Sequence, residues 1–332
     1  MMKEIIPGIH QLQLPLPVSG LKYVNTYLVQ GDNGYLLVDT GWNTEEAFKS
    51  LEKQLNEIGI GFEAISQIVV THIHPDHYGL AGRLKQLSQA KIFLHHLEEN
   101  LIEPRYIHMG GLLAQLEHWL HINGVIIGEL PQIQTASVGM ERFVAFAPPD
   151  IRLYGGEIIS TGRFSFQVIW TPGHSPGHIC LYEPAPRILI SGDNILPTIT
   201  PNVGLHPQSS KNPLGDYLNS LDTLKGLNVS LVLPGHESPF TELQLRIEEI
   251  LLHHKRRNSE ILQTIKAKPK TAYQIATEIT WTSDVRGIGW QTLNPWDKRL
   301  AILETIAHLE LMRADGKVNQ LRKDGTTYYQ SA

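Results

Sequence analysis

The sequence predicts an α/β protein built as an αββα sandwich, with two sheets face to face and helices on both outer surfaces. Short apolar runs recur along the chain, and His or Asp follows each one within a few residues. Such runs, closed by Gly or Pro, are typical of buried strands. They lie at 68–70, 164–170, 188–190 and 229–233. Segments with helical spacing flank them, as expected for a sandwich with its helices outside.

The first 95 residues are expected to form one sheet and its helices. Three strands form an antiparallel meander, at 9–16, 23–30 and 34–39. Two more strands are expected at 64–70 and 91–94. Residues 44–58 have helical spacing, and Asn43 or Thr44 could cap that helix. A further helix is expected from Asp76 to about Leu87.

Residues 97–148, approximately, interrupt the strand pattern and are interpreted as a helical insertion. Apolar side chains recur at near-helical spacing from Leu101 to Leu120, and a looser segment follows at 131–139. Two interpretations stay open. The insertion could cover the active site and select the substrate, or it could pack on the sandwich or on a second subunit. Its neighbouring histidines lack metal-type spacing and are predicted to be surface or packing residues: His95, His96, His108, His118 and His121.

The chain changes character near residue 243, so we expect a catalytic domain at 1–243 and a smaller domain at 244–332. Before the boundary, Asn212 could cap a helix that runs to about Lys225. After it, helical patterns are followed by a hairpin with an Asp-Gly turn. These segments are 243–265, 271–279, 295–312, 318–322 and 326–329. Helices followed by a hairpin predict a winged-helix-like fold, which could bind nucleic acid, line the substrate cleft or mediate dimerisation.

The segment Thr-His-Ile-His-Pro-Asp-His at 71–77 concentrates possible metal ligands directly after an apolar run. Its candidates are His72, His74, Asp76 and His77, and strand-like segments later deliver His174, Asp193 and His236. Imidazole and carboxylate groups suit Zn²⁺, and also Fe or Mn. A bound metal lowers the pKa of water to roughly 7, and two metals about 3.5–4 Å apart can share a hydroxide. The expected chemistry is therefore hydrolysis.

The order of these candidate ligands along the chain resembles that in the metallo-β-lactamase superfamily, and the resemblance spans roughly residues 10–240. The resemblance implies a metallo-β-lactamase sandwich with two divalent metal ions, expected to be Zn²⁺, with Fe or Mn as alternatives. The first ion would be held by His72, His74 and His174, the second by Asp76, His77 and His236, and Asp193 would bridge them. Asp76 would also act catalytically as a proton acceptor. Asp39, in Val-Asp-Thr-Gly, would orient a ligand through a hydrogen bond.

Details within the superfamily favour a hydrolase other than an antibiotic-degrading enzyme. Some true β-lactamases carry Cys where this chain has Asp193, and oxygen-reducing members usually carry Glu where it has His74. The string Thr-Pro-Gly-His-Ser-Pro-Gly-His at 171–178 looks like the glyoxalase II group, in which the second His, here His178, is not normally a ligand. The C-terminal domain resembles that of the LACTB2-like branch.

Two functions follow from these resemblances. The first is hydrolysis of a small thioester, ester or lactone through a metal-bridging hydroxide, and Tyr78 could hydrogen-bond that substrate. The second is cleavage of single-stranded RNA, which the LACTB2-like tail and its Lys and Arg content favour. A purely structural metal site is disfavoured, because structural zinc sites are usually closed by four protein ligands, often including Cys.

Composition is consistent with a soluble globular protein. The chain has 332 residues, 42% of them hydrophobic and 18% charged, which suits two domains with ample core. The single cysteine, Cys180, excludes an internal disulfide and indicates a reducing compartment. The N-terminus lacks the apolar stretch of a signal peptide or membrane anchor. We therefore expect a cytoplasmic protein with a small-molecule substrate and no membrane partner; a homo-oligomer stays open.

The net charge of −5 is unevenly distributed. Residues 244–332 carry 14 Lys and Arg against 10 Asp and Glu, a balance of +4, which leaves −9 for residues 1–243. The acidic part contains the candidate ligands, as expected for a cation-binding domain. The basic part is either an ordinary solvated surface or a surface for an anionic partner.

Overall fold

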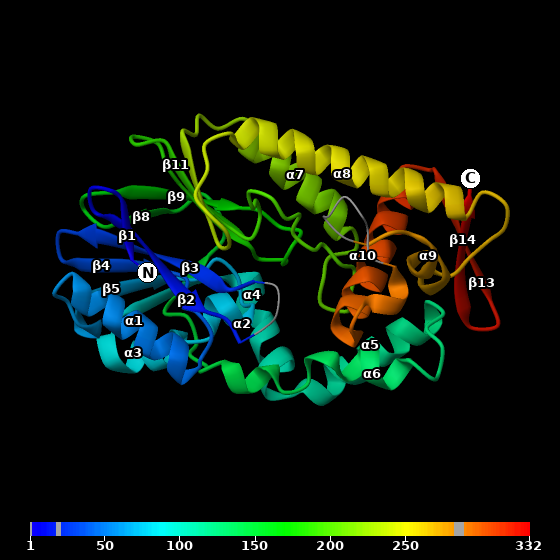
Figure 1. Ribbon diagram of the computed structural model, residues 1–332, viewed down its shortest axis with the longest axis horizontal. Coiled ribbons are helices and arrows are strands. Elements are labelled where there is room, and N and C mark those ends of the chain that lie inside the picture. Colours follow the sequence, from blue (N-terminus) through cyan, green and yellow to red (C-terminus); the bar gives the residue numbers. More distant parts are fainter. Residues whose placement is uncertain (1, 18–20, 282–288) are drawn as a thin grey trace.

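The structure, a computed structural model, describes residues 2–17, 21–281 and 289–332. Two sheets with helices on both outer faces confirm the predicted αββα sandwich (Figure 1). The first sheet has the order β1 (Lys3–Ile6), β2 (Ile9–Pro15), β3 (Tyr23–Gly31), β4 (Gly34–Val38), β5 (Ile65–Val69), β6 (Lys91–His95) and β7 (Ile151–Leu153). The second has the order β12 (Leu231–Pro234), β11 (Ile188–Gly192), β10 (Ile179–Glu183), β9 (Ser165–Trp170) and β8 (Ile158–Ser160).

Both faces of the central strands are buried, which explains their uninterrupted apolar sequences. In β4, Leu36 and Val38 face the second sheet, whereas Leu37 packs against the outer helices. In β10, Leu181 faces the first sheet and Cys180 faces outward. Successive side chains on a strand point to opposite faces, so each of these strands contributes to two layers. Because β4 is the neighbour of β5 and β10 lies between β9 and β11, these buried strands flank the strands that precede the candidate ligands.

Helices cover both outer faces, at the places the sequence predicts. On the first sheet lie α1 (Glu45–Glu57) and α3 (Ala81–Ser88), and on the second lie α7 (Pro213–Lys225) and α8 (Leu243–Thr264). The Thr44 hydroxyl caps α1 by accepting a hydrogen bond from the Ala47 N–H at 3.1 Å. Asn212 caps α7 by accepting from the Gly215 N–H at 3.1 Å. Each cap satisfies an amide that would otherwise lack a partner at the helix start.

The single helix expected from Asp76 to Leu87 is wrong, because the chain forms two helices, α2 (Pro75–Tyr78) and α3. Between them, the Leu80 N–H donates to the carbonyl of Gly41, and the Gly82 N–H donates to that of Ala145. These bonds to other segments replace two bonds that a continuous helix would make within itself. The first bond ties the segment after β5 to the loop after β4, and the second ties it to the segment that precedes β7.

The insertion is more helical than predicted at its C-terminal end. It contains α4 (His96–Ile102), the π-helix η2 (Glu103–Ile107), α5 (Met109–Ile122), α6 (Leu130–Gln134), and 3₁₀ turns η3 (Thr135–Ser137) and η4 (Met140–Phe143). Leu120 and Ile133 belong to the same hydrophobic cluster as Ile302 of the C-terminal residues. The insertion therefore packs on the C-terminal helices as well as on the sandwich (Figure 1).

The C-terminal residues form the expected helices and hairpin. They comprise α9 (Ala272–Glu278), η5 (Trp290–Thr292), α10 (Pro295–Ala314), β13 (Val318–Lys323) and β14 (Thr326–Ser331). Asp324 and Gly325 have φ of 48° and 78°, as a tight hairpin turn with two left-handed residues requires. The winged-helix assignment and the boundary at 243/244 stay predictions. None of the helices in the described ranges combines the length and apolar character needed to cross a membrane.

Candidate metal centre

The candidate ligands converge at one edge of the sandwich, where the strands that precede them end. His72 and His74 follow β5, whereas His174 follows β9. Asp193 directly follows β11, and His236 follows the parallel neighbour β12. Parallel strands end at the same edge of a sheet, which is where such sheets usually carry their chemistry. The structure thus brings together all seven residues that the sequence singled out.

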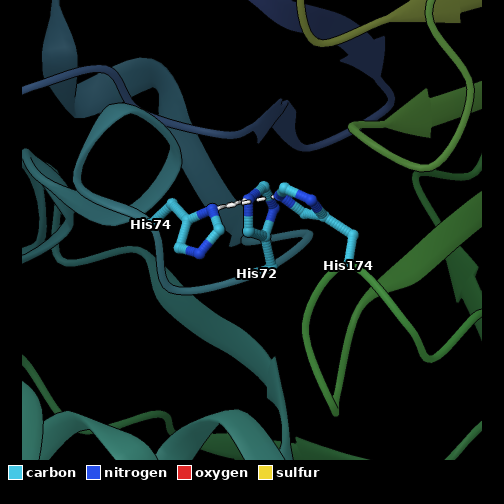
Figure 2. A group of neighbouring side chains, drawn as sticks. All are labelled: His72, His74 and His174. Atoms are coloured by element: carbon cyan, nitrogen blue, oxygen red, sulfur yellow. Dashed lines mark hydrogen bonds between the residues drawn. The ribbon is translucent and has the colours of Figure 1, made fainter. Parts of the chain in front are cut away.

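One group of three imidazoles converges on a single point (Figure 2). Nδ1 of His74 lies 2.9 Å from Nε2 of His72 and 3.1 Å from Nε2 of His174. Burial, followed by the neighbouring imidazoles, lowers the pKa of both His72 and His74 well below the usual value. These rings are therefore neutral at pH 7, which is the form that binds metals.

A second group contains two carboxylates and two imidazoles, Asp76, His77, Asp193 and His236. Oδ2 of Asp193 lies 3.3 Å from Nε2 of His77 and 3.4 Å from Nε2 of His236. It also lies 3.8 Å from Nε2 of His174, in the first group. One carboxylate oxygen thus lies between the two groups, as a bridging ligand would. Oδ2 of Asp76 completes the second group, 3.2 Å from Nε2 of His236.

The chemistry of this second group fits a bound cation. Nε2 of His77 and Oδ1 of Asp193 are buried, and no described residue forms a hydrogen bond with either. Burial alone would lower the pKa of His77, yet the carboxylates of Asp193 and Asp76 raise it well above its usual value. Burial would also lower the pKa of His236, but the carboxylates of Asp193 and Asp76 raise it to about 10. The site therefore stabilises positive charge at its centre and offers ligand atoms toward it.

Asp39 makes the hydrogen bonds that the sequence-based prediction requires of it. Its Oδ2 lies 2.8 Å from Nδ1 of His77 and accepts from the Thr71 hydroxyl at 2.9 Å. Its Oδ1 accepts from the Thr71 N–H at 2.8 Å. A carboxylate on one ring nitrogen sets the tautomer and leaves the other nitrogen as a ligand. Asp39 therefore directs Nε2 of His77 into the second group.

His178 lies outside both groups, as predicted, and holds Asp193 in place. Its Nε2 accepts a hydrogen bond from the Asp193 N–H at 3.2 Å, and its Nδ1 lies 2.8 Å from the Thr171 hydroxyl oxygen. An imidazole that accepts at Nε2 carries its proton on Nδ1. The second histidine of the Thr171–His178 string therefore supports a candidate ligand without being one.

Sequence reasoning missed Glu98, which joins the two loops that carry the first three imidazoles. This buried carboxylate accepts hydrogen bonds from the Ile73 N–H at 2.9 Å and the Gly177 N–H at 2.7 Å. It also accepts from the Ser175 hydroxyl at 2.5 Å. Ile73 lies between His72 and His74, and Ser175 follows His174. Glu98 thus ties the β5 loop to the β9 loop.

A second missed contact connects the site to α10. Nδ1 of His174 lies 2.8 Å from the backbone carbonyl oxygen of Asn202. The side-chain amide of Asn202 donates to Glu304 of α10 at 3.0 Å. The sequence around Asn202 and Glu304 contains no recognisable motif, so neither contact could be predicted from it.

The suggestion that Tyr78 hydrogen-bonds the substrate is wrong. Its side chain is fully buried, and its hydroxyl donates to the Ala147 carbonyl at 2.5 Å and accepts from the Ala147 N–H at 3.0 Å. His95, one of the histidines predicted to pack, is buried and stacks on Trp170 with ring centroids 5.5 Å apart. Neither group of candidate ligands contains it.

Comparison with known proteins indicates one superfamily. Residues 19–236 match the model of the Metallo-beta-lactamase superfamily. The chain is 25% identical to the probable metallo-hydrolase YqjP of Bacillus subtilis, over 96% of this chain and 97% of that protein. It is 26% identical to the acyl-coenzyme A thioesterase MBLAC2 of Bos taurus, over 72% of this chain and 81% of that protein.

A solved structure resembles the whole fold. The crystal structure of a metallo-beta-lactamase family protein from Thermus thermophilus superimposes with a TM-score of 0.82 and 30% identity. The match covers 99% of this chain and 100% of the Thermus chain. The likeness therefore extends beyond the sandwich to the insertion and the C-terminal residues.

Proposed function

Because the chain belongs to the metallo-β-lactamase superfamily, we propose that this metallo-hydrolase uses two divalent metal ions to cleave a small thioester, ester or lactone. The observation that carries the proposal is the position of Asp193. Its Oδ2 lies within 3.8 Å of Nε2 of His174 and 3.4 Å of Nε2 of His236. One oxygen in reach of both groups supports two adjacent cations bridged by a carboxylate.

In this proposal the first ion would be held by His72, His74 and His174, and the second by Asp76, His77 and His236. Asp193 would bridge them, and Asp39 would orient His77. The absence of cysteine from both groups, and their imidazole and carboxylate composition, suit Zn²⁺, with Fe or Mn as alternatives.

When bound, the metal ions supply an activated water molecule and polarise the carbonyl oxygen of the substrate. Asp76 would accept a proton from the attacking water. Burial would raise the pKa of Asp76, but the imidazoles of His77 and His236 outweigh it and lower that pKa, so the carboxylate is ionised. The water oxygen would bond to the acyl carbon, the carbon–sulfur or carbon–oxygen bond would break, and the leaving group would take up the proton held by Asp76. The products are a carboxylic acid and a thiol or alcohol.

Three observations support an acyl substrate. The Thr171–His178 string resembles the glyoxalase II group, and both of its histidines contribute to the site. Asp193 stands where some β-lactamases have Cys, and Cys180 is buried in β10, facing the outer helices. One relative, at 26% identity, is named an acyl-coenzyme A thioesterase.

Cleavage of single-stranded RNA is the competing function. It is favoured by the basic balance of residues 244–332 and by the exposed strand β13, which includes Arg322 and Lys323. Phosphodiester binding would weaken steeply with salt because counterions are released from the nucleic acid. Hydrolysis of an uncharged ester would show little such dependence.

A parallel assay tests the proposal. Metal-loaded protein is given S-acyl glutathione, an acyl-CoA, a lactone, bis-p-nitrophenyl phosphate and a short unstructured RNA, each at two ionic strengths. We expect turnover of a carboxylic substrate and two equivalents of metal by elemental analysis. Salt-sensitive cleavage of RNA alone would replace the acyl hydrolase with the nuclease, and a single equivalent of metal would exclude the dinuclear site.

A further inference from the structure

Arg105 lies near His74 of the candidate metal centre, and Arg299 lies near Arg105. Neither arginine forms an ion pair with a carboxylate among the described residues. Arg105 belongs to the π-helix η2, and across the residues that the structure describes its guanidinium makes one hydrogen bond, from Nε to Oε1 of Gln208 at 2.9 Å. Arg299 of α10 is only 5% exposed and donates to the carbonyl of Gln134 and the hydroxyl of Ser137. Burial, followed by the charge of Arg105, lowers the pKa of Arg299 to about 10.

The loop 202–210 adds further hydrogen-bond donors at the same place. Nε2 of Gln208 is buried and has no hydrogen-bond partner within the described ranges. Nδ1 of His206 accepts from the Gln208 N–H at 3.2 Å, which leaves Nε2 of His206 to carry the proton. Burial, followed by the charges of Arg105 and Arg299, lowers the pKa of His206 to about 3, so this ring is a neutral donor. The cluster therefore offers donors and positive charge, and no carboxylate in the described part of the chain forms an ion pair with its arginines.

Both segments that carry this cluster are anchored to the loops of the candidate ligands. The Tyr106 hydroxyl, next to Arg105, donates to the carbonyl of Ile73 at 2.6 Å. At the start of the other segment, the carbonyl of Asn202 lies 2.8 Å from Nδ1 of His174. The Trp119 indole also donates to the carbonyl of Leu205 at 3.1 Å. The position of Arg105 on a π-helix is notable because single π-turns are frequent at functional sites.

We propose that Arg105, Gln208 and His206 bind an anionic group of the substrate, a carboxylate or a phosphate, next to the metal centre. The inference rests on the proposed acyl hydrolase and narrows its substrates to thioesters or esters that carry an acidic group. The planar guanidinium of Arg105 can bind such a group through two parallel hydrogen bonds. The amide of Gln208 supplies a third donor, and Arg299 adds positive charge behind it.

The alternative is that these residues only join the insertion to the C-terminal helices. In a purely structural contact we expect each positive group to face a negative one. Lys298 of α10 and Glu129 of the insertion form such an ion pair at 3.2 Å. A partly buried guanidinium without a carboxylate is costly. A substrate that brings the negative charge explains why this arrangement persists.

The experiment compares thioesters that differ in charge, with the metal-loaded full-length enzyme. S-acyl glutathione carries carboxylates, an acyl-CoA carries phosphates, and an S-acyl N-acetylcysteamine is neutral. We expect Arg105→Gln to raise KM for at least one anionic thioester by roughly 10- to 100-fold, with kcat nearly unchanged. KM for the neutral thioester should not change. A higher KM for S-acyl glutathione would show that the cluster binds a carboxylate, and a higher KM for the acyl-CoA would show that it binds a phosphate.

Gln208→Glu is the second variant, and Arg142→Gln is the control. Gln208→Glu is nearly isosteric and places a carboxylate against Nε of Arg105, so it should raise KM for the same anionic thioester even if Arg105→Gln folds poorly. Arg142 is an exposed arginine of the same insertion, and its substitution should leave all three KM values unchanged. Equal changes for charged and neutral thioesters, or no change in either variant, would overturn the proposal.

A binding measurement separates this inference from the proposed function. If the wild-type enzyme hydrolyses none of the thioesters, the acyl hydrolase fails, and melting in sulfate then tests the anion site alone. Sulfate should raise Tm above that in chloride of equal ionic strength by more in the wild type and in Arg142→Gln than in Gln208→Glu, because sulfate also stabilises folded proteins without binding to a site. An identical response of all three proteins would exclude the site. Cleavage of RNA that depends on Arg105 would assign the cluster to a nucleic acid instead.

Discussion

Nδ1 of His174 lies 2.8 Å from the carbonyl oxygen of Asn202, and this contact connects the candidate metal centre to the C-terminal helices. The Asn202 side chain donates to Glu304 of α10 at 3.0 Å. The carboxylate of Glu304 in turn lies 3.8 Å from Nε of Arg257 of α8. An acceptor on Nδ1 fixes the ring so that Nε2 is the ligand atom. Residues beyond 243 therefore orient an imidazole that the sandwich itself provides.

The first prediction concerns Glu304→Gln. Replacing the carboxylate with a neutral amide weakens the acceptor of the Asn202 side chain and loosens the carbonyl that orients His174. Partners of metal ligands typically change metal affinity by 10- to 100-fold, and we expect about tenfold here because the contact is indirect. The measurement is competition with a metal chelator. Glu310→Gln, on the same helix but paired with Arg313 nearer the surface, should leave affinity unchanged, and an equal loss in both variants would contradict the argument.

The second prediction compares the neighbours Glu98 and Glu99. Glu98→Gln turns an amide nitrogen toward one of the donors that the carboxylate now accepts, so a buried donor is left unsatisfied. We expect a loss of about 1–3 kcal/mol in the free energy of unfolding, together with weaker metal binding. Glu99 pairs with Arg152, whose side chain is 59% exposed, and Glu99→Gln should cost little. Urea unfolding of the two variants measures the difference, and equal stabilities would show that the bonds of Glu98 contribute nothing.

The third prediction concerns Asp39→Asn. Asp39 has φ of 61°, a left-handed conformation that Asn tolerates and Ala does not. The substitution therefore keeps the backbone while removing the negative charge 2.8 Å from Nδ1 of His77. We expect activity to fall roughly 10- to 100-fold, with the far-ultraviolet circular dichroism unchanged. Thr71→Ser keeps the hydroxyl that donates to Asp39 and should retain most activity. Full activity of Asp39→Asn would mean that His77 needs no carboxylate partner.

The candidate ligands could be predicted from the sequence because each lies within a few residues of the end of a strand that has a recognisable apolar pattern. Four of them fall between His72 and His77, so their proximity does not depend on the fold. The remaining three depend only on strands that end at one edge. Both faces of β11 are buried and β12 is nearly so, and such strands appear as continuous apolar runs. In β9, Ser165 and Gln167 are exposed, so apolar and polar side chains alternate at its start.

The supporting residues could not be predicted, because their roles arise from packing between distant segments. Glu98 contacts Gly177, 79 positions away, and Asn202 contacts Glu304, 102 positions away. In the sequence, Glu98 resembles any acidic residue in the first turn of a helix. The break between α2 and α3 has the same origin, because the carbonyl that receives the Leu80 N–H belongs to Gly41 in another loop.

The last prediction concerns acid stability and the histidine pair between α8 and α10. Nδ1 of His254 lies 3.3 Å from Nε2 of His308, and Nδ1 of His308 lies 2.6 Å from Oδ1 of Asn258. Burial, followed by the charges of His253 and Arg257, lowers the pKa of His254 to about 3. Burial likewise lowers the pKa of His308 well below its usual value. Both rings are therefore neutral in the folded protein at pH 7.

In the unfolded chain each of these histidines titrates near its ordinary pKa of about 6.5. Below that pH the unfolded state binds more protons than the folded state, so the stability present at neutral pH is lost as pH falls, by up to about 1.4 kcal/mol per unit for each ring. His254→Gln should reduce this slope between about pH 6.5 and about pH 4. Urea unfolding across that range measures it, and subtraction from the wild type removes the contribution of the shared metal centre. His118→Gln, at an exposed position, should keep the wild-type slope, and the same slope in His254→Gln would mean that the buried pair does not set acid stability.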